Sequence, residues 1–166
     1  MPSCRPDVIP EIIYKIMEMK PKTVLDVGAG HGKWGCLIAE YCKYWLNYLP
    51  VIDAIEFFES YKSPAYGFYR TVWQGSNVMD LLGLMDRYDL VLIIDVIEHL
   101  DRWEGKKLLA SIKNHYIVST PGYWSPQTAM FGNERERHVS RWALEDFENS
   151  RTVVAQDGRS HILGWK

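Results

Sequence analysis

Residues 88–95 (YDLVLIID) form a nearly continuous apolar run that is rich in leucine and isoleucine. Such a run is typical of a strand that is covered on both faces, as in parallel sheets. Shorter strands are predicted at 23–27, 51–56, 70–74 and 115–120, with helices at 33–48 and 101–113 between them. This alternation predicts an open, mostly parallel α/β sheet. Right-handed crossovers would place its helices on both faces.

The two ends of the chain complete this expected domain. Ile9, Ile12, Ile13, Ile16 and Met17 have helical spacing, so residues 1–20 are expected to contain an N-terminal helix, with Asp7 as its N-cap and Pro21 beyond its end. At the other end, Ser140 is expected to cap a helix at 142–148, and 152–155 with 161–165 are expected to form a hairpin around Gly158. Because the sequence has no repeat and no linker, we expect one domain over 1–166.

Composition narrows the classes of partner and location. The 19 basic and 21 acidic residues give a net charge of −2, so no overall basic field favours nucleic acid. The three cysteines, Cys4, Cys36 and Cys42, include no C-x-x-C pair, which argues against disulfides and a structural zinc site; no metal site is predicted. No apolar run is long enough to span a membrane, and the first residues lack the apolar core of a signal peptide. We therefore expect a cytoplasmic protein.

A glycine-rich turn, Gly28-Ala29-Gly30-His31-Gly32, follows the first strand. Gly30, Gly32 and Gly35 match a dinucleotide fingerprint, but that fingerprint starts where the strand ends, and here the strand ends at Val27. Asp26 would then repel a pyrophosphate, whereas a carboxylate suits a cationic ligand group. A tight turn that needs small residues for structural reasons is the alternative.

The glycine turn and the later IIDVIEHL resemble motifs of the class I S-adenosylmethionine (SAM) dependent methyltransferases. The resemblance implies a seven-stranded Rossmann-like sheet with a C-terminal antiparallel hairpin, and SAM as the cofactor. It also implies roles in cofactor binding. The backbone of the turn, including Gly28, Ala29, Gly30 and Gly32, would approach the methionine moiety and ribose, Asp26 would lie near the amino group, and Glu56 would accept from the ribose hydroxyls. Phe57 or Phe58 would pack on adenine, and Asn77 with Val78 would lie at the adenine edge, where the family usually has an aspartate.

The acceptor side of the site is expected just after strand 88–95. Asp95 would orient the methionine end or the acceptor, and His99 is the candidate general base, since an imidazole titrates near neutrality. His138 is a second candidate base; both histidines could instead order their loops. Residues 121–141 interleave aromatic and basic side chains, Tyr123, Trp124 and Phe131 among them, and are expected to form a lid over the acceptor.

The sequence thus favours methyl transfer from SAM to an oxygen, nitrogen or carbon atom of a small or medium-sized molecule. An RNA or protein methyltransferase and a catalytically silent SAM-binding domain are the alternatives. Similar enzymes that methylate amino groups of DNA bases have an N-P-P-Y type tetrapeptide after the strand corresponding to 88–95. The corresponding residues here read DVIE, so base modification is disfavoured. An NAD-linked oxidoreductase is disfavoured by the position of Asp26. The sequence indicates neither the acceptor nor an oligomeric state.

Overall fold

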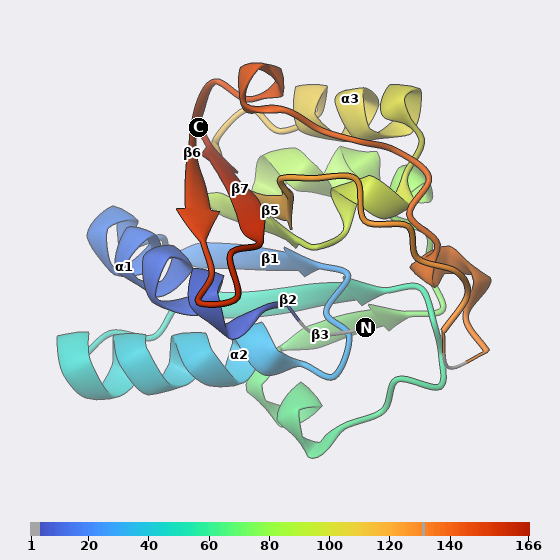
Figure 1. Ribbon diagram of the computed structural model, residues 1–166. Helices are drawn as coiled ribbons and strands as arrows, with labels where there is room; N and C mark the ends of the chain where they lie inside the picture. The colour runs from blue at the N-terminus through green and yellow to red at the C-terminus, as the bar shows by residue number, and fades with distance from the viewer. Residues whose placement is uncertain (1–3, 131) are drawn as a thin grey trace.

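A seven-stranded sheet with strand order β3-β2-β1-β4-β5-β7-β6 forms the centre of the molecule (Figure 1). The computed structural model describes residues 4–130 and 132–166. The strands are β1 Thr23–Val27, β2 Val51–Glu56, β3 Thr71–Gln74, β4 Leu90–Ile94, β5 His115–Pro121, β6 Asn149–Val154 and β7 Ser160–Trp165. β1 to β5 pair in parallel, whereas β7 is antiparallel to both of its neighbours, β5 and β6. The predicted fold class is confirmed.

Helices cover both faces of this sheet. They are α1 Ile9–Met19, α2 Lys33–Ile38, which continues as a π-helix over Ala39–Trp45, and α3 Arg102–Ala110. Short 3-10 turns occupy Pro6–Val8, Pro64–Phe68, Val78–Asp80, Leu82–Arg87, Ile97–His99, Glu134–Glu136 and Leu144–Asp146. Within the described residues, no helix is both long and apolar enough to cross a membrane.

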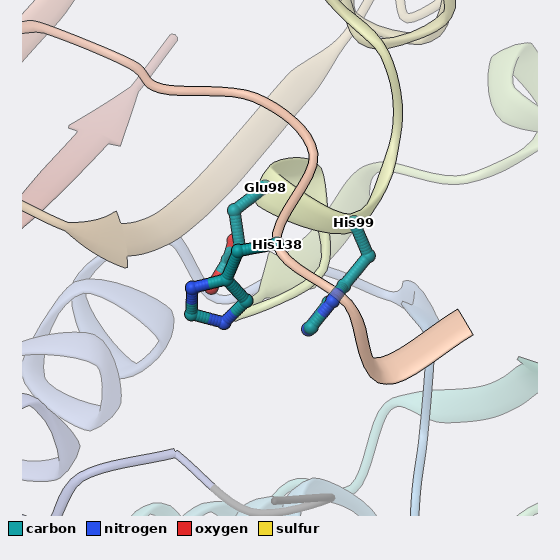
Figure 2. A group of neighbouring side chains, drawn as sticks. All are labelled: Glu98, His99 and His138. Atoms are coloured by element: carbon teal, nitrogen blue, oxygen red, sulfur yellow. The ribbon is translucent and has the colours of Figure 1, made fainter. Parts of the chain in front are cut away.

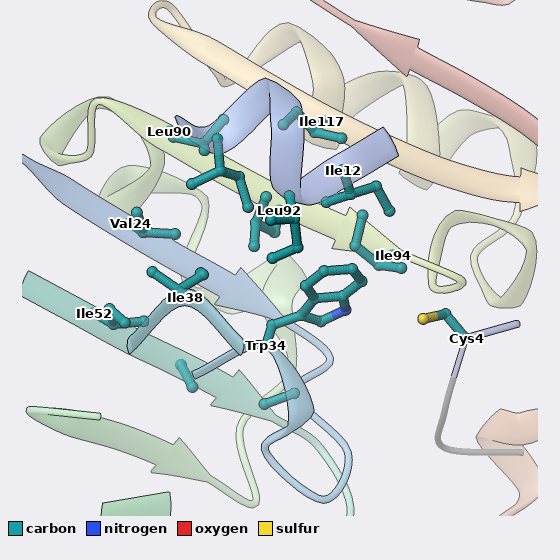
Figure 3. Close-up of a cluster of buried hydrophobic side chains, with 14 of the residues drawn as sticks. Cys4, Ile12, Val24, Trp34, Ile38, Ile52, Leu90, Leu92, Ile94 and Ile117 are labelled. Atoms are coloured by element: carbon teal, nitrogen blue, oxygen red, sulfur yellow. The ribbon is translucent and has the colours of Figure 1, made fainter. Parts of the chain in front are cut away.

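α1 and α2 share one face of the sheet. Figure 3 shows Ile12 of α1 with Trp34 and Ile38 of α2 against strand side chains such as Val24 and Leu92. All five are buried. Full burial of each aliphatic side chain stabilises the fold by about 1.5–3 kcal/mol. This packing holds the N-terminal end of α2 against the sheet, directly after the glycine turn.

The next residues along the strands point to the opposite face. Leu25 of β1 and Val91 of β4 lie there with Leu108 of α3 and with Trp142, which comes from the segment before β6. Because successive strand side chains alternate between faces, a strand covered on both sides must be apolar throughout. β4 meets this requirement, since each of its residues is buried.

The N-cap of α1 lies one residue later than predicted. Asp7 lies inside the 3-10 turn Pro6–Val8, and the N-cap of α1 is Val8, whose side chain makes no capping bond. The prediction of Asp7 as the cap is therefore wrong. The far end follows expectation: Lys20 adopts a left-handed conformation and its N–H bonds Ile16 O, after which Pro21 cannot extend the helix.

The helix predicted at 142–148 is absent, and only the 3-10 turn Leu144–Asp146 forms. Ser140 does not cap it. The hydroxyl of Ser140 donates to Ile97 O and accepts from Trp142 Nε1, while the Trp142 ring enters the core. β6 begins at Asn149, three residues before the predicted first strand of the hairpin. Tertiary packing of Trp142 thus overrides the local capping signal.

The other helix ends are shifted by a few residues. The helix predicted at 33–48 ends at Trp45, and α3 ends at Ala110 rather than at residue 113. At its start, α3 has the reciprocal capping box of Asp101 and Glu104. Most of the segment 122–141 is irregular and runs over the carboxyl ends of the parallel strands (Figure 1). Phe131 lies outside the described residues.

Candidate active site

An open cleft lies at the carboxyl ends of β1, β2 and β4. Its volume is about 920 Å³, counting the solvent-filled space at its mouth. Of the predicted cofactor residues, Gly28, Ala29, Gly30, Glu56, Phe57, Asn77, Val78 and Asp95 line the cleft. Asp26 and Gly32 do not. The position agrees with the rule that open α/β sheets bind ligands beyond the carboxyl ends of their strands.

The glycine turn forms one wall of the cleft. Gly28 has a φ of 71°, and a Cβ at this position would lie 2.4 Å from Val96 Cγ2. The turn is tied to β2, since the N–H groups of Gly28 and Ala29 both donate to Ile55 O. Tyr66 braces it from the other side, with its hydroxyl donating to Gly30 O at 2.7 Å. This wall is therefore bare backbone, which a ligand can approach closely.

Asp26 lies beneath the turn rather than in the cleft. Its side chain is only 1% exposed. Oδ2 accepts from the Tyr69 hydroxyl at 2.6 Å, and that hydroxyl accepts from Gly35 N–H. Oδ1 has no hydrogen-bond partner, and burial raises the pKa of Asp26 to about 7. Asp26 thus links the strand end to the start of α2, and its side chain does not line the cleft.

Glu56, the last residue of β2, spans the cleft floor. Its side chain is 5% exposed, and burial raises its pKa. Oε2 accepts from Gly30 N–H at 2.7 Å and Oε1 accepts from Phe58 N–H at 2.8 Å. The Phe57 N–H also lowers the pKa of Glu56 as a hydrogen-bond donor. Because a carboxylate has about four acceptor positions, Glu56 still has capacity for a further hydrogen bond.

Beyond Glu56, the cleft is lined by the residues predicted to contact adenine. The Phe57 ring is 42% exposed, and the Arg135 guanidinium lies 5.0 Å from its centroid. Asn77 Oδ1 accepts from Met79 N–H and so caps the turn Val78–Asp80. The Asn77 side chain therefore has a structural role in this turn while it also lines the cleft.

Asp95 follows β4 with a φ of 53°, an uncommon backbone conformation for a residue other than glycine. Its N–H donates to Ser119 O, and Ser119 Oγ donates to Asp95 Oδ1 at 2.6 Å. His161 Nε2 lies 3.7 Å from the same oxygen. Neighbours on β5 and β7 therefore fix the carboxylate at the cleft.

The two candidate bases lie side by side, with ring centroids 4.9 Å apart (Figure 2). His99 lines the cleft, whereas His138 lines a smaller hollow beside it together with Glu98. Burial lowers the pKa of both histidines, so both are neutral near pH 7. Burial also raises the pKa of Glu98 well above its usual value, and the nearby Asp95 raises it further.

Sequence reasoning missed part of the lining. Cys4, Lys33, Trp34 and Tyr61 also face the cleft. Lys33 and Trp34 could have been found, because they directly follow the glycine turn. No local pattern marks Cys4 or Tyr61.

The predicted lid also contributes to the cleft, through Asn133, Arg135 and Glu136. Glu136 is tied across the cleft, where its Oε1 accepts from the Tyr61 hydroxyl at 2.9 Å. The segment is also attached to the loop after β4, since the N–H groups of Val139 and Ser140 both donate to Glu98 O.

No protein-family model and no curated protein matches this chain. Solved structures do resemble it. The 1,6-didemethyltoxoflavin-N1-methyltransferase of Burkholderia thailandensis, crystallised with 1,6-didemethyltoxoflavin and S-adenosylhomocysteine, has a TM-score of 0.65 at 18% identity, over 96% of this chain and 77% of that one. A SAM-dependent methyltransferase of Archaeoglobus fulgidus has a TM-score of 0.56 at 15% identity, over 95% and 94%.

A third similar structure is an O-methyltransferase family protein of Burkholderia thailandensis, with a TM-score of 0.54 at 10% identity over 93% of this chain. This chain spans about half of its length, 55%. The strand order, the reversed β7 and these similarities define the class I, Rossmann-like methyltransferase fold. The fold that the sequence resemblance implied is therefore the fold of this chain.

Proposed function

We propose that the protein transfers a methyl group from SAM to a small-molecule acceptor. The observation that carries the proposal is the Glu56 carboxylate, which is held at the glycine turn, lines the cleft and retains acceptor capacity. A pair of adjacent ribose hydroxyls fits such a carboxylate. The structural likeness to a methyltransferase crystallised with S-adenosylhomocysteine supports the same cofactor.

The cleft offers a place for each part of SAM. With the ribose on Glu56, the methionine moiety would lie along the bare backbone of Gly28 and Gly30. The adenine would lie between Phe57 and Val78. Asp26 would act by holding the turn, because it lies beneath the cleft. The sulfonium methyl would then face Asp95 and His99, at the end of the cleft beside β4.

Methyl transfer needs the acceptor atom in line with the sulfonium. The acceptor atom attacks the methyl carbon, the carbon–sulfur bond breaks, and its electron pair remains on sulfur, which yields S-adenosylhomocysteine. Positioning supplies much of the rate of such a step. The segment containing Asn133, Arg135 and Glu136 covers part of the cleft, which favours a small acceptor over a macromolecular one. Neutral His99 has a ring nitrogen lone pair beside this position, able to take a proton or to bind a cation.

Calorimetry with SAM, S-adenosylhomocysteine and NAD⁺ tests the cofactor. We expect binding of the first two and none of NAD⁺. Glu56→Gln should weaken S-adenosylhomocysteine binding by about 1.5–3 kcal/mol, the scale for hydrogen bonds to a charged group. Glu59→Gln, at an exposed neighbouring position, is the matched control and should bind like the wild type. Equal affinity of the two variants would remove Glu56 from the site.

Methyl transfer itself is tested with radiolabelled SAM and a panel of small hydroxylated and amine-bearing compounds, with tRNA and a protein mixture as further acceptors. Label in small molecules alone supports the proposal. Label in RNA or protein alone would overturn the acceptor class. Tight SAM binding with no acceptor labelled would indicate a silent SAM-binding domain.

A further inference from the structure

Three side chains that are common metal ligands meet beside the cleft. Glu98 and His99 lie on the turn Ile97–His99, and His138 comes from the segment before β6 (Figure 2). One ligand atom of each lies within 4.8 Å of those of the other two. The backbone bonds from Val139 and Ser140 to Glu98 O hold the two segments together. The cluster is therefore built by the tertiary fold.

Glu98 shows that this cluster is more than a chance grouping. Its side chain is 3% exposed, and Oε2 has no hydrogen-bond partner. The Thr120 side chain hydrogen-bonds this carboxyl group, but leaving Oε2 buried without a partner is costly. Among the salt bridges of the described residues, none involves Glu98. A cation between Glu98 and the two imidazoles would offset the cost of its burial.

Both histidines are oriented as metal ligands usually are. His99 Nδ1 lies 3.0 Å from Arg137 O, and His138 Nδ1 lies 2.5 Å from Ser125 O. A carbonyl oxygen can only accept, so each Nδ1 carries the proton and each Nε2 carries the lone pair. Fixing the ring through one nitrogen on a backbone carbonyl is the usual support of a metal-bound imidazole.

We propose that Glu98, His99 and His138 together bind one divalent first-row transition cation. Two imidazole nitrogens and one carboxylate oxygen suit Zn²⁺, Mn²⁺, Fe²⁺ or Co²⁺ better than Ca²⁺ or Mg²⁺, which prefer oxygen ligands. Three protein ligands also leave coordination positions open, as in catalytic sites. At bond lengths of about 2.1 Å the ligand atoms of a tetrahedral site lie roughly 3.4 Å apart. Side-chain rotations that move these atoms by about 1 Å would therefore complete the site.

The location of the cluster indicates its use. His99 faces the cleft, while Glu98 and His138 face the smaller hollow that Tyr123 and Trp124 also line. A cation there would be reached by an acceptor from the hollow and by the SAM methyl group from the cleft. The acceptor would then supply an oxygen ligand, such as a hydroxyl, whose proton passes to water as the oxygen binds the cation. This use rests on the proposed function, and in it His99 is a ligand rather than the general base.

Metal binding is tested on the full chain after removal of metals with a chelator. Titration with Co²⁺ should give visible absorption bands of a bound ion that saturate at one equivalent, and calorimetry with Zn²⁺ should give the same stoichiometry. His99→Gln and His138→Gln should each weaken binding at least tenfold. His115→Gln is the matched control, because His115 likewise contacts a backbone carbonyl through Nδ1 but lies far from the cluster, at the start of β5.

The outcomes are separable from those of the cofactor experiment. Calorimetry with S-adenosylhomocysteine on the metal-free protein, and on both variants, reports whether the fold and the cofactor cleft are intact. Stoichiometric Co²⁺ binding lost in both variants supports the metal site, whether or not S-adenosylhomocysteine binds. Absence of stoichiometric binding by the wild type, or equal affinity of the variants and the control, would overturn it.

Discussion

Replacing Asp26 by asparagine should make the protein less sensitive to pH. The buried carboxyl has a pKa raised to about 7 from its ordinary value of 3.8, chiefly because burial disfavours its charge; the Tyr69 hydroxyl partly offsets this, and Glu56 adds to it. Between these two values the folded state holds a proton that the unfolded state has lost. Stability attributable to Asp26 therefore falls as the pH rises from about 4 to about 7, and then levels off.

The size of the effect follows from the two pKa values. From pH 5 to pH 8, linkage at 1.36 kcal/mol per unit makes the wild type lose about 3 kcal/mol through this one group. Asparagine has no charge to bury, and its side-chain oxygen can still accept from Tyr69. The free energy of unfolding of Asp26→Asn, minus that of the wild type, should therefore increase by about 3 kcal/mol over this range.

Urea unfolding at pH 5 and at pH 8 measures this difference directly. Other carboxyl groups titrate in both proteins and cancel in the subtraction. Asp80→Asn, at an exposed position, is the control and should show one stability difference at both pH values. A difference for Asp26→Asn that is the same at pH 5 and pH 8 would refute the reasoning, because it would mean that the folded state does not hold the extra proton.

Three further outcomes follow from the packing. Gly28→Ala should lower S-adenosylhomocysteine affinity at least tenfold in calorimetry, because the new Cβ meets Val96 and the φ of 71° disfavours alanine; an unchanged affinity would contradict the close approach of backbone and ligand. Trp142→Ala should cost about 3–5 kcal/mol in urea unfolding, since the buried ring belongs to the same core cluster as Leu108; a loss under 1 kcal/mol would contradict this role in the core. If the segment 121–141 is a mobile lid, trypsin should cut at Arg135 or Arg137 in the free protein and be blocked by cofactor with acceptor; equal cleavage with and without ligands would retire the lid.

The sheet could be predicted because its signals are local. An uninterrupted apolar run predicts β4, and three spaced glycines predict the turn after β1. The position of Glu56 at the cleft could be predicted because it ends a strand, and the carboxyl ends of parallel strands meet at one edge. The helix predicted at 142–148 failed for the opposite reason, because Trp142 is drawn into a core formed by distant residues.

The same contrast holds within the candidate site. Asp26 was placed correctly at the end of β1, but sequence could not show that Tyr69, from another segment, binds it beneath the turn. His99 and His138 were singled out separately, and their pairing with Glu98 depends on backbone bonds between two loops. Such long-range contacts leave no spacing pattern, so the cluster appears only once the chain is folded.

A crystal structure of the protein with S-adenosylhomocysteine tests the central claim most directly. The account predicts the two ribose hydroxyls within about 3 Å of the Glu56 carboxylate oxygens. It also predicts the methionine moiety along Gly28 and Gly30, and the sulfur facing Asp95 and His99. S-adenosylhomocysteine bound elsewhere, or a cleft that stays empty at saturating ligand while Glu56 keeps its bonds to Gly30 and Phe58, would contradict the proposal that this cleft binds SAM for methyl transfer.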